Sequence, residues 1–234
     1  MSLRDDADLA SGALKRCVLF RDVGDPGLTL LAGSMRARRY RRNEVVFHQG
    51  DPGDSLYVIV AGSVKIVLPS PEGDEAIIAT LRRGDFFGEL ALLDGAEHSA
   101  SATALEPTET LVLSRDAFLR LVDAERGLRT ALLSSLAGEL RRLTRHVEEL
   151  HFLDLAGRLA MRLVNLATEA QPDGANDVRL AWPFTQSDLA AMIGGTRQSV
   201  NRLLNELVDD GVIRLEGDEL VIPDLALLRR RAER

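Results

Sequence analysis

Residues 184–222 decide the fold of the C-terminal part, and they read FTQSDLAAMIGGTRQSVNRLLNELVDDGVIRLEGDELVI. Thr185 stands three residues before Asp188, which is the spacing of a capping box at the start of a helix. Gly194–Gly195 ends that helix, because glycine adopts left-handed backbone dihedrals at little cost. Thr196 can then cap a second helix. Two helices joined by a tight glycine turn predict a helix-turn-helix.

The second predicted helix has one apolar face and one polar face. Its apolar face comprises Val200, Leu203, Leu204 and Leu207. The N-terminal part of the polar face carries side chains that pair with DNA bases: arginine with guanine, glutamine with adenine, and serine with bases or phosphate. This helix is therefore the predicted reader of DNA. The residues that we expect to contact DNA are Thr196, Arg197, Gln198, Ser199 and Arg202.

The segment that follows, GVIRLEGDELVI, predicts a β-hairpin around residues 216–218, so that the whole stretch forms a winged helix-turn-helix. A plain helical hairpin with a solvated polar face is the alternative. A helix-turn-helix accounts for more of the pattern than this alternative does, because it explains why the buried stripe, the turn glycines and the polar face all coincide. Acidic residues outnumber basic ones across residues 152–234. Few arginines are left to contact phosphate, and we expect weak DNA binding by a single copy.

The N-terminal half of the chain has a period of two, interrupted by glycine. Residues 44–68, EVVFHQGDPGDSLYVIVAGSVKIVL, contain three short apolar runs separated by turns. Further runs follow at residues 76–81 (AIIATL) and 109–114 (ETLVLS). Many short strands with glycine turns predict a β-sandwich, jelly roll or barrel between residues 39 and 114.

Between residues 115 and 150 the period becomes helical. Apolar residues recur at alternating spacings of three and four, over more than two heptads. An a/d stripe of this kind predicts a parallel seam between two copies of the helix. The alternative, which stays open, is an amphipathic helix that lies on its own β domain. The predicted dimer interface comprises Leu133, Leu136, Leu140, Leu143, Val147 and Leu150.

Composition narrows the classes of protein. With 234 residues and 45% hydrophobic residues, the chain reads as one or two globular domains with no membrane-spanning segment. The first residues, MSLRDDADLA, do not resemble a signal peptide, and Cys17 is the single cysteine. We therefore expect a cytoplasmic protein without disulfides or an iron–sulfur cluster. The net charge of −7 argues against nonspecific DNA binding but not against a specific reader.

An enzyme is not expected. The segment GDSLY at residues 53–57 lacks the pattern of a nucleophile elbow, and no ligand spacing typical of a zinc site is present. Haem sensing would need an axial ligand. The four histidines qualify by residue type only, and they are His48, His98, His146 and His151.

Four stretches, in order, resemble the cyclic-AMP receptor and fumarate–nitrate reductase regulator (CRP/FNR) family of bacterial transcription regulators. They are VVFHQGDPGDSLYVIVAGSVKI, RRGDFFGELALLDG, FLDLAGRLAMRLVNLA and TQSDLAAMIGGTRQSVNRLLNELVDDGVI. The resemblance covers all but about the first thirty residues. It implies an α+β fold: a double-stranded β-roll of the cyclic-nucleotide-binding type with an N-terminal helical segment (1–115), a long dimerisation helix (116–151) and a winged helix-turn-helix (152–234).

The same resemblance implies a homodimer that binds a two-fold symmetric site in double-stranded DNA and recruits or blocks RNA polymerase. It also implies an effector pocket. Members that bind cyclic nucleotides hold the phosphate with helix N-terminal amides, an arginine and a serine or threonine, while an acidic residue binds the ribose. Gly88, Glu89 and Ser99 match this pattern, but His98 occupies the arginine position. The candidate effector pocket comprises Gly88, Glu89, Leu90, His98, Ser99 and Thr144.

The missing arginine leaves two interpretations of the pocket open. A charged bidentate partner contributes about 1.5–3 kcal/mol, and a histidine with a pKa near 6.5 is mostly neutral at pH 7. Either the β-roll has lost or exchanged its ligand, or it binds a cyclic nucleotide such as cyclic AMP in some form. Arg82 and Arg83 lie nearby in sequence and are candidates to replace the missing cation. If His98 holds the phosphate, binding should improve towards pH 6. No cofactor other than this effector is predicted.

The function predicted from the sequence is a homodimeric, sequence-specific transcription regulator under allosteric control. A cyclic-nucleotide-regulated signalling module that does not recognise DNA is the alternative.

Overall fold

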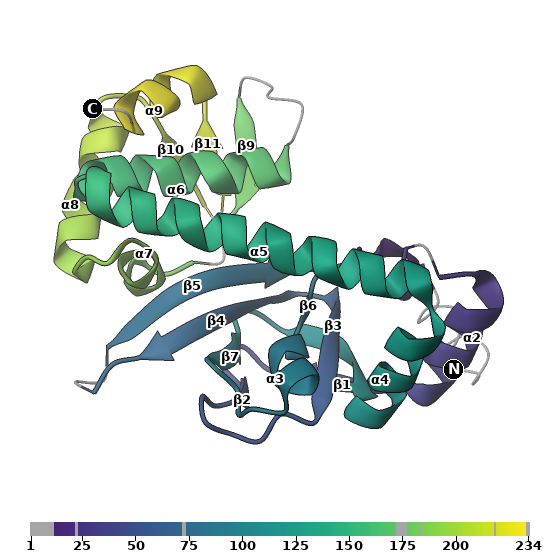
Figure 1. The fold of residues 1–234 in the computed structure, drawn as a ribbon. Coiled ribbons are helices and arrows are strands. Elements are labelled where there is room, and N and C mark those ends of the chain that lie inside the picture. Colours follow the sequence, from purple (N-terminus) through teal and green to yellow (C-terminus); the bar gives the residue numbers. More distant parts are fainter. Residues whose placement is uncertain are drawn as a thin grey trace. The chain divides into compact units, whose positions relative to one another are not determined.

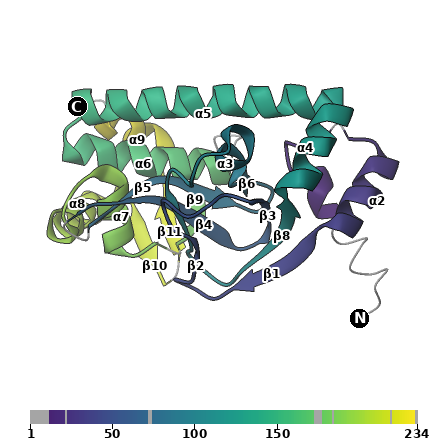
Figure 2. The same ribbon diagram turned by 60° about the horizontal axis from the view of Figure 1, so that its bottom comes forward.

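A computed structural model describes residues 12–21, 23–71, 74–171, 177–182, 184–217 and 219–232. The chain divides into two compact units, Met1–Arg141 and Arg142–Arg234 (Figure 1). The sequence predicted three segments instead. The difference arises because the long helix α5 (Arg126–Phe152) is one continuous element that contributes residues to both units (Figure 2).

The first unit contains a β-roll made of two four-stranded antiparallel sheets. One sheet has the order β1 (Arg36–Tyr40), β8 (Thr108–Ser114), β3 (Ser55–Ala61) and β6 (Phe86–Phe87). The other has the order β2 (Val45–Phe47), β7 (Ser101–Ala104), β4 (Ser63–Pro69) and β5 (Glu75–Arg82). The strands predicted within residues 44–68, 76–81 and 109–114 are confirmed.

The interior of the roll is apolar and rich in aromatic rings. The buried residues of this core are Tyr57, Ile59, Val64, Phe87 and Ala102. Strand β7 was not predicted, because its four residues are small and all are buried. All four side chains are buried although they point alternately to the two faces of the sheet, so no alternation of exposed polar and buried apolar residues marks this strand.

A second core lies between the sheet of β3 and β8 and the helices of the first unit. Residues 12–16 and α2 (Asp25–Ser34) precede the roll, and α4 (Arg115–Ala124) follows it. Cys17 is buried in this core, and burial raises the pKa of its thiol to about 12, so the thiol stays protonated and unreactive. Other fully buried members are Leu14, Phe20, Leu56, Leu113, Phe118 and Leu128.

The predicted helix of residues 116–151 is two helices rather than one. The backbone is extended at Glu125 (φ −107°, ψ 103°), which separates α4 from α5. This break lets Phe118 of α4 and Leu128 of α5 pack into the same core. A single straight helix would carry the second residue away from that core, since ten residues span about 15 Å.

The second unit is a winged helix-turn-helix with one helix added at each end. Its elements are α6 (Leu155–Ala170), β9 (Val178–Ala181), α7 (Gln186–Ile193), α8 (Arg197–Asp209), β10 (Arg214–Glu216), β11 (Glu219–Ile222) and α9 (Leu225–Ala232). The strands form an antiparallel sheet in the order β10, β11, β9. Helix α9 was not predicted. It packs against α6 and buries Leu225, Leu228 and Ala232.

These two units confirm the predicted α+β fold. None of the helices in the described part of the chain is both long enough and apolar enough to cross a membrane.

Candidate nucleic-acid interface and effector pocket

Helix α7 begins and ends with the predicted caps. The Thr185 hydroxyl accepts from the Asp188 amide at 3.1 Å, and the Asp188 carboxylate accepts from the Thr185 amide at 2.9 Å. Gly194 has φ +67°, in the left-handed region that glycine favours. Gly195 has another role, because a Cβ there would lie 2.8 Å from Leu155 Cδ1 of α6. The second glycine therefore lets α6 pack closely against the turn.

Helix α8 has the two predicted faces. Val200, Leu203, Leu204 and Leu207 are all buried. Arg197, Gln198 and Arg202 are exposed on the other side. Thr196 caps the helix by accepting from the Ser199 amide at 3.1 Å, and the two hydroxyls lie 2.9 Å apart. The helix N-terminus, where amides point outward, favours a phosphate oxygen.

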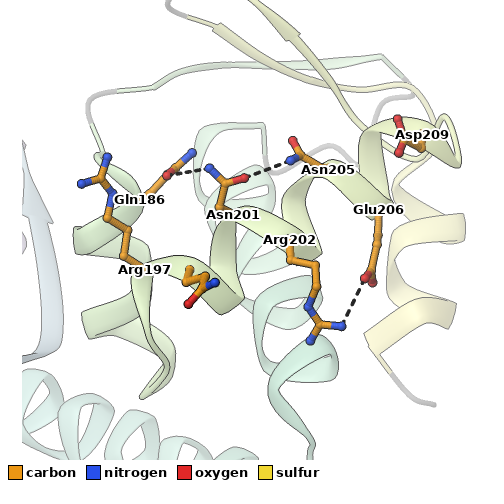
Figure 3. A pocket seen from close by; sticks show the side chains of 8 residues that line it. Gln186, Arg197, Asn201, Arg202, Asn205, Glu206 and Asp209 are labelled. Atoms are coloured by element: carbon orange, nitrogen blue, oxygen red, sulfur yellow. Dashed lines mark hydrogen bonds and ion pairs between the residues drawn. The ribbon is translucent and has the colours of Figure 1, made fainter.

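The exposed face of α8 borders a hollow of about 710 Å³ (Figure 3). Three of the predicted DNA contacts, Arg197, Gln198 and Arg202, line it. Gln186, Asn201 and Asn205 also line it, although sequence reasoning did not select them. The sequence does contain a signal for the two asparagines of α8, because Asn201 and Asn205 follow Arg197 at intervals of four and so share its face of the helix. Two acidic residues, Glu206 and Asp209, complete the lining.

Arg202 is held in place without being buried. Its guanidinium lies 3.5 Å from the Glu206 carboxylate, one turn further along α8, and 71% of its side chain is exposed. An ion pair of this kind contributes only about 0.3–0.5 kcal/mol, so Arg202 can exchange this partner for a base or a phosphate at little cost.

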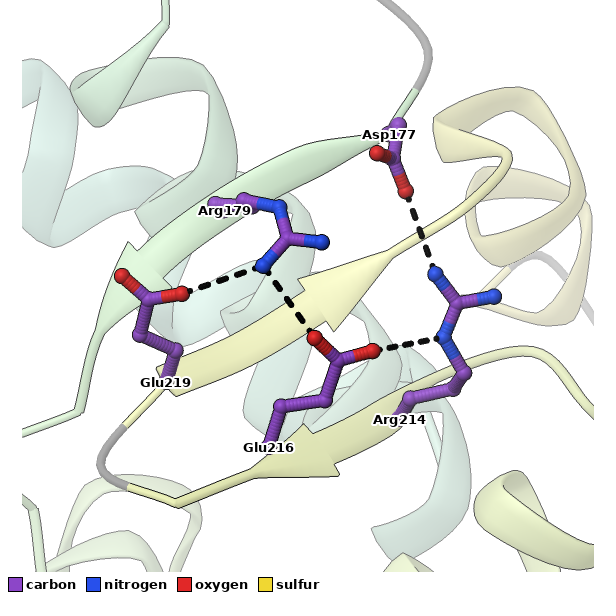
Figure 4. A network of polar contacts seen from close by, with 5 residues as sticks. All are labelled: Asp177, Arg179, Arg214, Glu216 and Glu219. Carbon is purple, nitrogen blue, oxygen red and sulfur yellow. Dashed lines mark hydrogen bonds and ion pairs between the residues drawn. The ribbon is translucent and has the colours of Figure 1, made fainter.

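The wing carries a network of alternating charges (Figure 4). Arg179 contacts Glu216 and Glu219 at 3.1 and 3.2 Å. Arg214 contacts Glu216 and Asp177 at 3.2 and 3.3 Å. The two arginines of this network are therefore shared among three carboxylates. They therefore contribute little net positive charge to this face of the sheet.

The a/d positions of α5 differ in exposure. Leu133, Leu140 and Val147 have exposed fractions of 68%, 67% and 65%, and Leu143 and Leu150 are also exposed. Leu136 differs, because it is half-buried against the core between the sheet of β3 and β8 and the helices, to which Leu128 and Leu132 belong. The start of α5 thus packs on its own domain, as the alternative interpretation held. An apolar stripe beyond it is uncovered.

The candidate effector pocket surrounds the short helix α3 (Glu89–Asp94). Gly88 precedes α3 with φ +88°, and a Cβ there would lie 2.7 Å from the carbonyl oxygen of Ser55, so glycine is required. Burial raises the pKa of the Glu89 carboxyl. The neighbouring Leu90 is 46% exposed, and Ser99 is exposed.

Other candidates for this pocket lie on other elements. Thr144 is exposed on the part of α5 that belongs to the second unit. Of the two substitute cations, Arg82 ends β5 and Arg83 lies in the turn after it.

His98 is buried rather than presented to solvent. Its ring stacks on Phe47 with centroids 3.6 Å apart and planes 6° from parallel. Its backbone is tied to the turn before β3, since His98 N donates to Asp51 O and Gly50 N donates to His98 O, both at 2.9 Å. A Cβ on Gly53 would contact both Ala91 of α3 and the His98 ring, so His98 does lie beside α3.

Burial lowers the pKa of the His98 imidazole, although Asp51 and Asp54 oppose this effect. The imidazole is thus neutral at pH 7, and the expected gain in phosphate binding near pH 6 moves to more acidic pH. The described groups at the predicted pocket, Gly88, Glu89, His98 and Ser99, include no cation at neutral pH.

The lowered pKa of His98 also predicts that acid weakens the β-roll. The unfolded chain binds a proton at His98 near pH 6.5, whereas the folded chain resists it, so stability should fall as pH drops below about 6.5. Replacing His98→Gln should remove this part of the pH dependence, even though it lowers stability overall. Thermal unfolding of both proteins between pH 7.5 and 5.5 measures the difference. Equal slopes would show that His98 titrates normally in the folded protein.

Both units of the chain, and the chain as a whole, are similar to known proteins. Residues 37–125 match the family model of the cyclic nucleotide-binding domain, and residues 157–231 match that of the Crp-like helix-turn-helix domain. A CRP-like cAMP-activated global transcriptional regulator from Mycobacterium tuberculosis is 32% identical over 219 residues, which cover 94% of this chain and 98% of the relative.

The cAMP-activated global transcriptional regulator CRP from Salmonella typhimurium is 32% identical over 210 residues, with 88% and 98% of the two chains covered. Among solved structures, FixK2 from Bradyrhizobium japonicum matches with a TM-score of 0.76 at 24% identity, over 84% of this chain and 96% of that one. At that identity the likeness supports the fold.

Proposed function

From the premise that this chain belongs to the CRP/FNR family of transcription regulators, we propose that it acts as a homodimer that reads a specific two-fold symmetric DNA site. The family comprises DNA-binding regulators rather than enzymes. The observation that carries the proposal is the structure of α8. Its inner face is buried, its N-terminus is capped by Thr196, and its outer face presents Arg197, Gln198 and Arg202.

Two copies are needed for strong binding. The arginines of the wing network are paired with carboxylates, and Arg202 shares its charge with Glu206, so one copy offers DNA little net positive charge. Two copies present two reader helices to half-sites about 34–36 Å apart, one turn of DNA. The exposed stripe of α5 is the surface that we assign to the dimer contact.

The test is selection of bound DNA from a random duplex library at one fixed salt concentration, with and without cyclic nucleotides. We expect an enriched sequence with inverted repeats. If no sequence is enriched under any condition, the proposal is wrong. Tight nucleotide binding without a DNA shift at low salt would favour the rival function, a signalling module that does not recognise DNA.

We further propose that the β-roll controls DNA binding. An effector in the roll would shift α5. The connection at residues 153–154, where Asp154 caps the start of α6, would transmit the shift to the reader helix α8. Binding of the effector and of DNA must then promote one another to the same extent, because coupling of two equilibria is reciprocal. The regulator would act in the cytoplasm and would recruit or block RNA polymerase.

Cyclic AMP is the effector class to test first, since the relatives from Mycobacterium tuberculosis and Salmonella typhimurium are named as cAMP-activated. We expect the natural protein to bind cyclic AMP weakly or not at all at pH 7.5, because the neutral His98 offers the phosphate no charge. Replacing His98→Arg should raise the affinity by about tenfold or more. A guanidinium is planar and can stack on Phe47 as the imidazole does.

Isothermal titration of both proteins at pH 7.5 and pH 6 measures these affinities. Tight binding by the natural protein at pH 7.5 would show that another cation, such as Arg82 or Arg83, already serves the phosphate. Absence of binding by either protein would show that this pocket does not take cyclic AMP.

A further inference from the structure

Three carboxamides form a row across the hollow beside α8. Gln186 is the first residue of α7, whereas Asn201 and Asn205 lie one turn apart on α8. Asn201 Nδ2 donates to Gln186 Oε1 at 3.0 Å, and Asn205 Nδ2 donates to Asn201 Oδ1 at 2.9 Å. Figure 3 shows the three amides following one another, with Asn201 in the middle.

The row leaves Asn201 with unused hydrogen-bonding capacity. A carboxamide offers two N–H donors and two acceptor lone pairs. Asn201 uses one donor towards Gln186 and one lone pair towards Asn205, so within the described part of the chain one N–H and one lone pair stay available. If all three amides were turned over together, the donors and acceptors of the row would exchange. Asn201 would still keep one of each, so this result does not depend on how the amides are assigned.

One N–H and one lone pair of the same amide are complementary to the major-groove edge of adenine, which presents an acceptor at N7 and a donor at N6. Guanine presents two acceptors, so its O6 would face the free lone pair of Asn201. Cytosine offers only a donor at this edge, and thymine offers an acceptor and a methyl group. Adenine is thus the base that satisfies both free groups.

We propose that Asn201 is a specificity-determining residue that reads an adenine in each half-site. Gln186 and Asn205 are the positioning residues that hold its amide. The inference rests on the proposed function, since it assumes that α8 lies in the major groove. Asn201 lies in the hollow together with Arg197 and Arg202 and immediately precedes Arg202. Because Gln186 comes from another helix, the Asn201 side chain is oriented before DNA binds, which lowers the entropy lost on binding.

The first experiment compares the natural protein with Asn201→Ala and Asn201→Asp by library selection and by titration of the selected site. We expect Asn201→Ala to lower affinity about five- to hundredfold per half-site and to abolish the preference for adenine at one position. Asn201→Asp keeps the size of the side chain but only accepts hydrogen bonds, so the preference should move towards cytosine. Arg202→Ala is the matched control, and it should leave the adenine position unchanged.

A chemical probe makes the same test without altering the protein. Replacing the selected adenine by 7-deazaadenine removes the N7 acceptor and keeps the N6 donor. The natural protein should bind this DNA at least about fivefold more weakly, and Asn201→Ala should bind both DNAs equally. A loss of the same size in both proteins would overturn the assignment. This comparison needs only the natural protein and Asn201→Ala, so it stays valid if another variant folds poorly.

The positioning residues require a readout that simple loss of structure would not change. Gln186→Ala should lower the ratio of affinities for adenine over the other bases. Gln186→Glu keeps an acceptor for Asn201 Nδ2, so it should keep that ratio while its charge weakens binding to all DNA alike. Asn205→Ala should lower the ratio as well. Equal loss on every sequence for Gln186→Ala would show that Gln186 supports only the fold.

Failure of the inference is separable from failure of the proposed function. If the natural protein enriches no sequence, the proposed function fails and this inference fails with it. If the natural protein enriches a sequence and Asn201→Ala enriches the same one with unchanged base preferences, only the inference is wrong.

Discussion

Replacing Leu140→Asp or Val147→Asp on α5 is expected to prevent formation of the proposed dimer and to leave monomers. Both side chains are about two-thirds exposed in the single chain, at the a positions of the predicted seam. In a parallel dimer each would face its own counterpart, so the substitution would bury two like charges without partners. Each unpaired buried charge costs several kcal/mol, which exceeds what a short seam can offset. Affinity for a two-fold symmetric site should fall by at least about a hundredfold.

Sedimentation equilibrium measures the mass of each protein, and titration with the selected site measures the affinity. Ser134→Asp is the matched control, because it places the same charge on an exposed position of the same helix outside the a/d stripe. We expect this control to stay dimeric. An unchanged dimer mass for both Leu140→Asp and Val147→Asp would mean that the association surface lies elsewhere.

Replacing Arg202→Ala is expected to cost about 1–3 kcal/mol per contacted base pair in each half-site and to relax the preference for guanine there. An arginine binds guanine through two parallel hydrogen bonds, which alanine cannot replace. Glu206→Gln is the matched control, since it removes the ion-pair partner and leaves Arg202 in place. That control should change affinity by less than about 0.5 kcal/mol, apart from a uniform gain from the lost negative charge.

Base preference separates the two roles that Arg202 could have. Library selection with the natural protein and with Arg202→Ala shows whether one position loses its preference. If affinity falls equally on all sequences, Arg202 contacts phosphate and the assignment to a base is wrong.

Much of the C-terminal unit was predictable from sequence because its signals are local. The capping box of Thr185 and Asp188, the left-handed Gly194 and the cap at Thr196 each involve residues within four positions of one another. Helical periodicity likewise identified the buried face of α8 and the stripe on α5. The strands of the roll followed from alternation wherever one face is covered, but β7, covered on both faces, did not.

Contacts between distant segments decided the rest. Nothing near His98 in the sequence indicates that its ring stacks on Phe47, 51 positions earlier, or that burial lowers the pKa of its imidazole. The extended residue Glu125 similarly reflects packing of Phe118 and Leu128 into one core, which also draws in Leu136.

The polar face of α8 shows the same division between local and long-range effects. The sequence determined by itself which face of α8 is polar and that arginine and glutamine stand on it, because a helical period depends only on spacing along the chain. Only the tertiary structure decided what those side chains can do. It pairs Asn201 with Gln186 of another helix, and it joins Arg179 and Arg214 to the carboxylates of Glu216 and Asp177, 37 positions away in the chain. The hydrogen-bonding capacity that a side chain has left, and the net charge around it, depend on its neighbours in space. The order of residues along the chain does not reveal which residues these are.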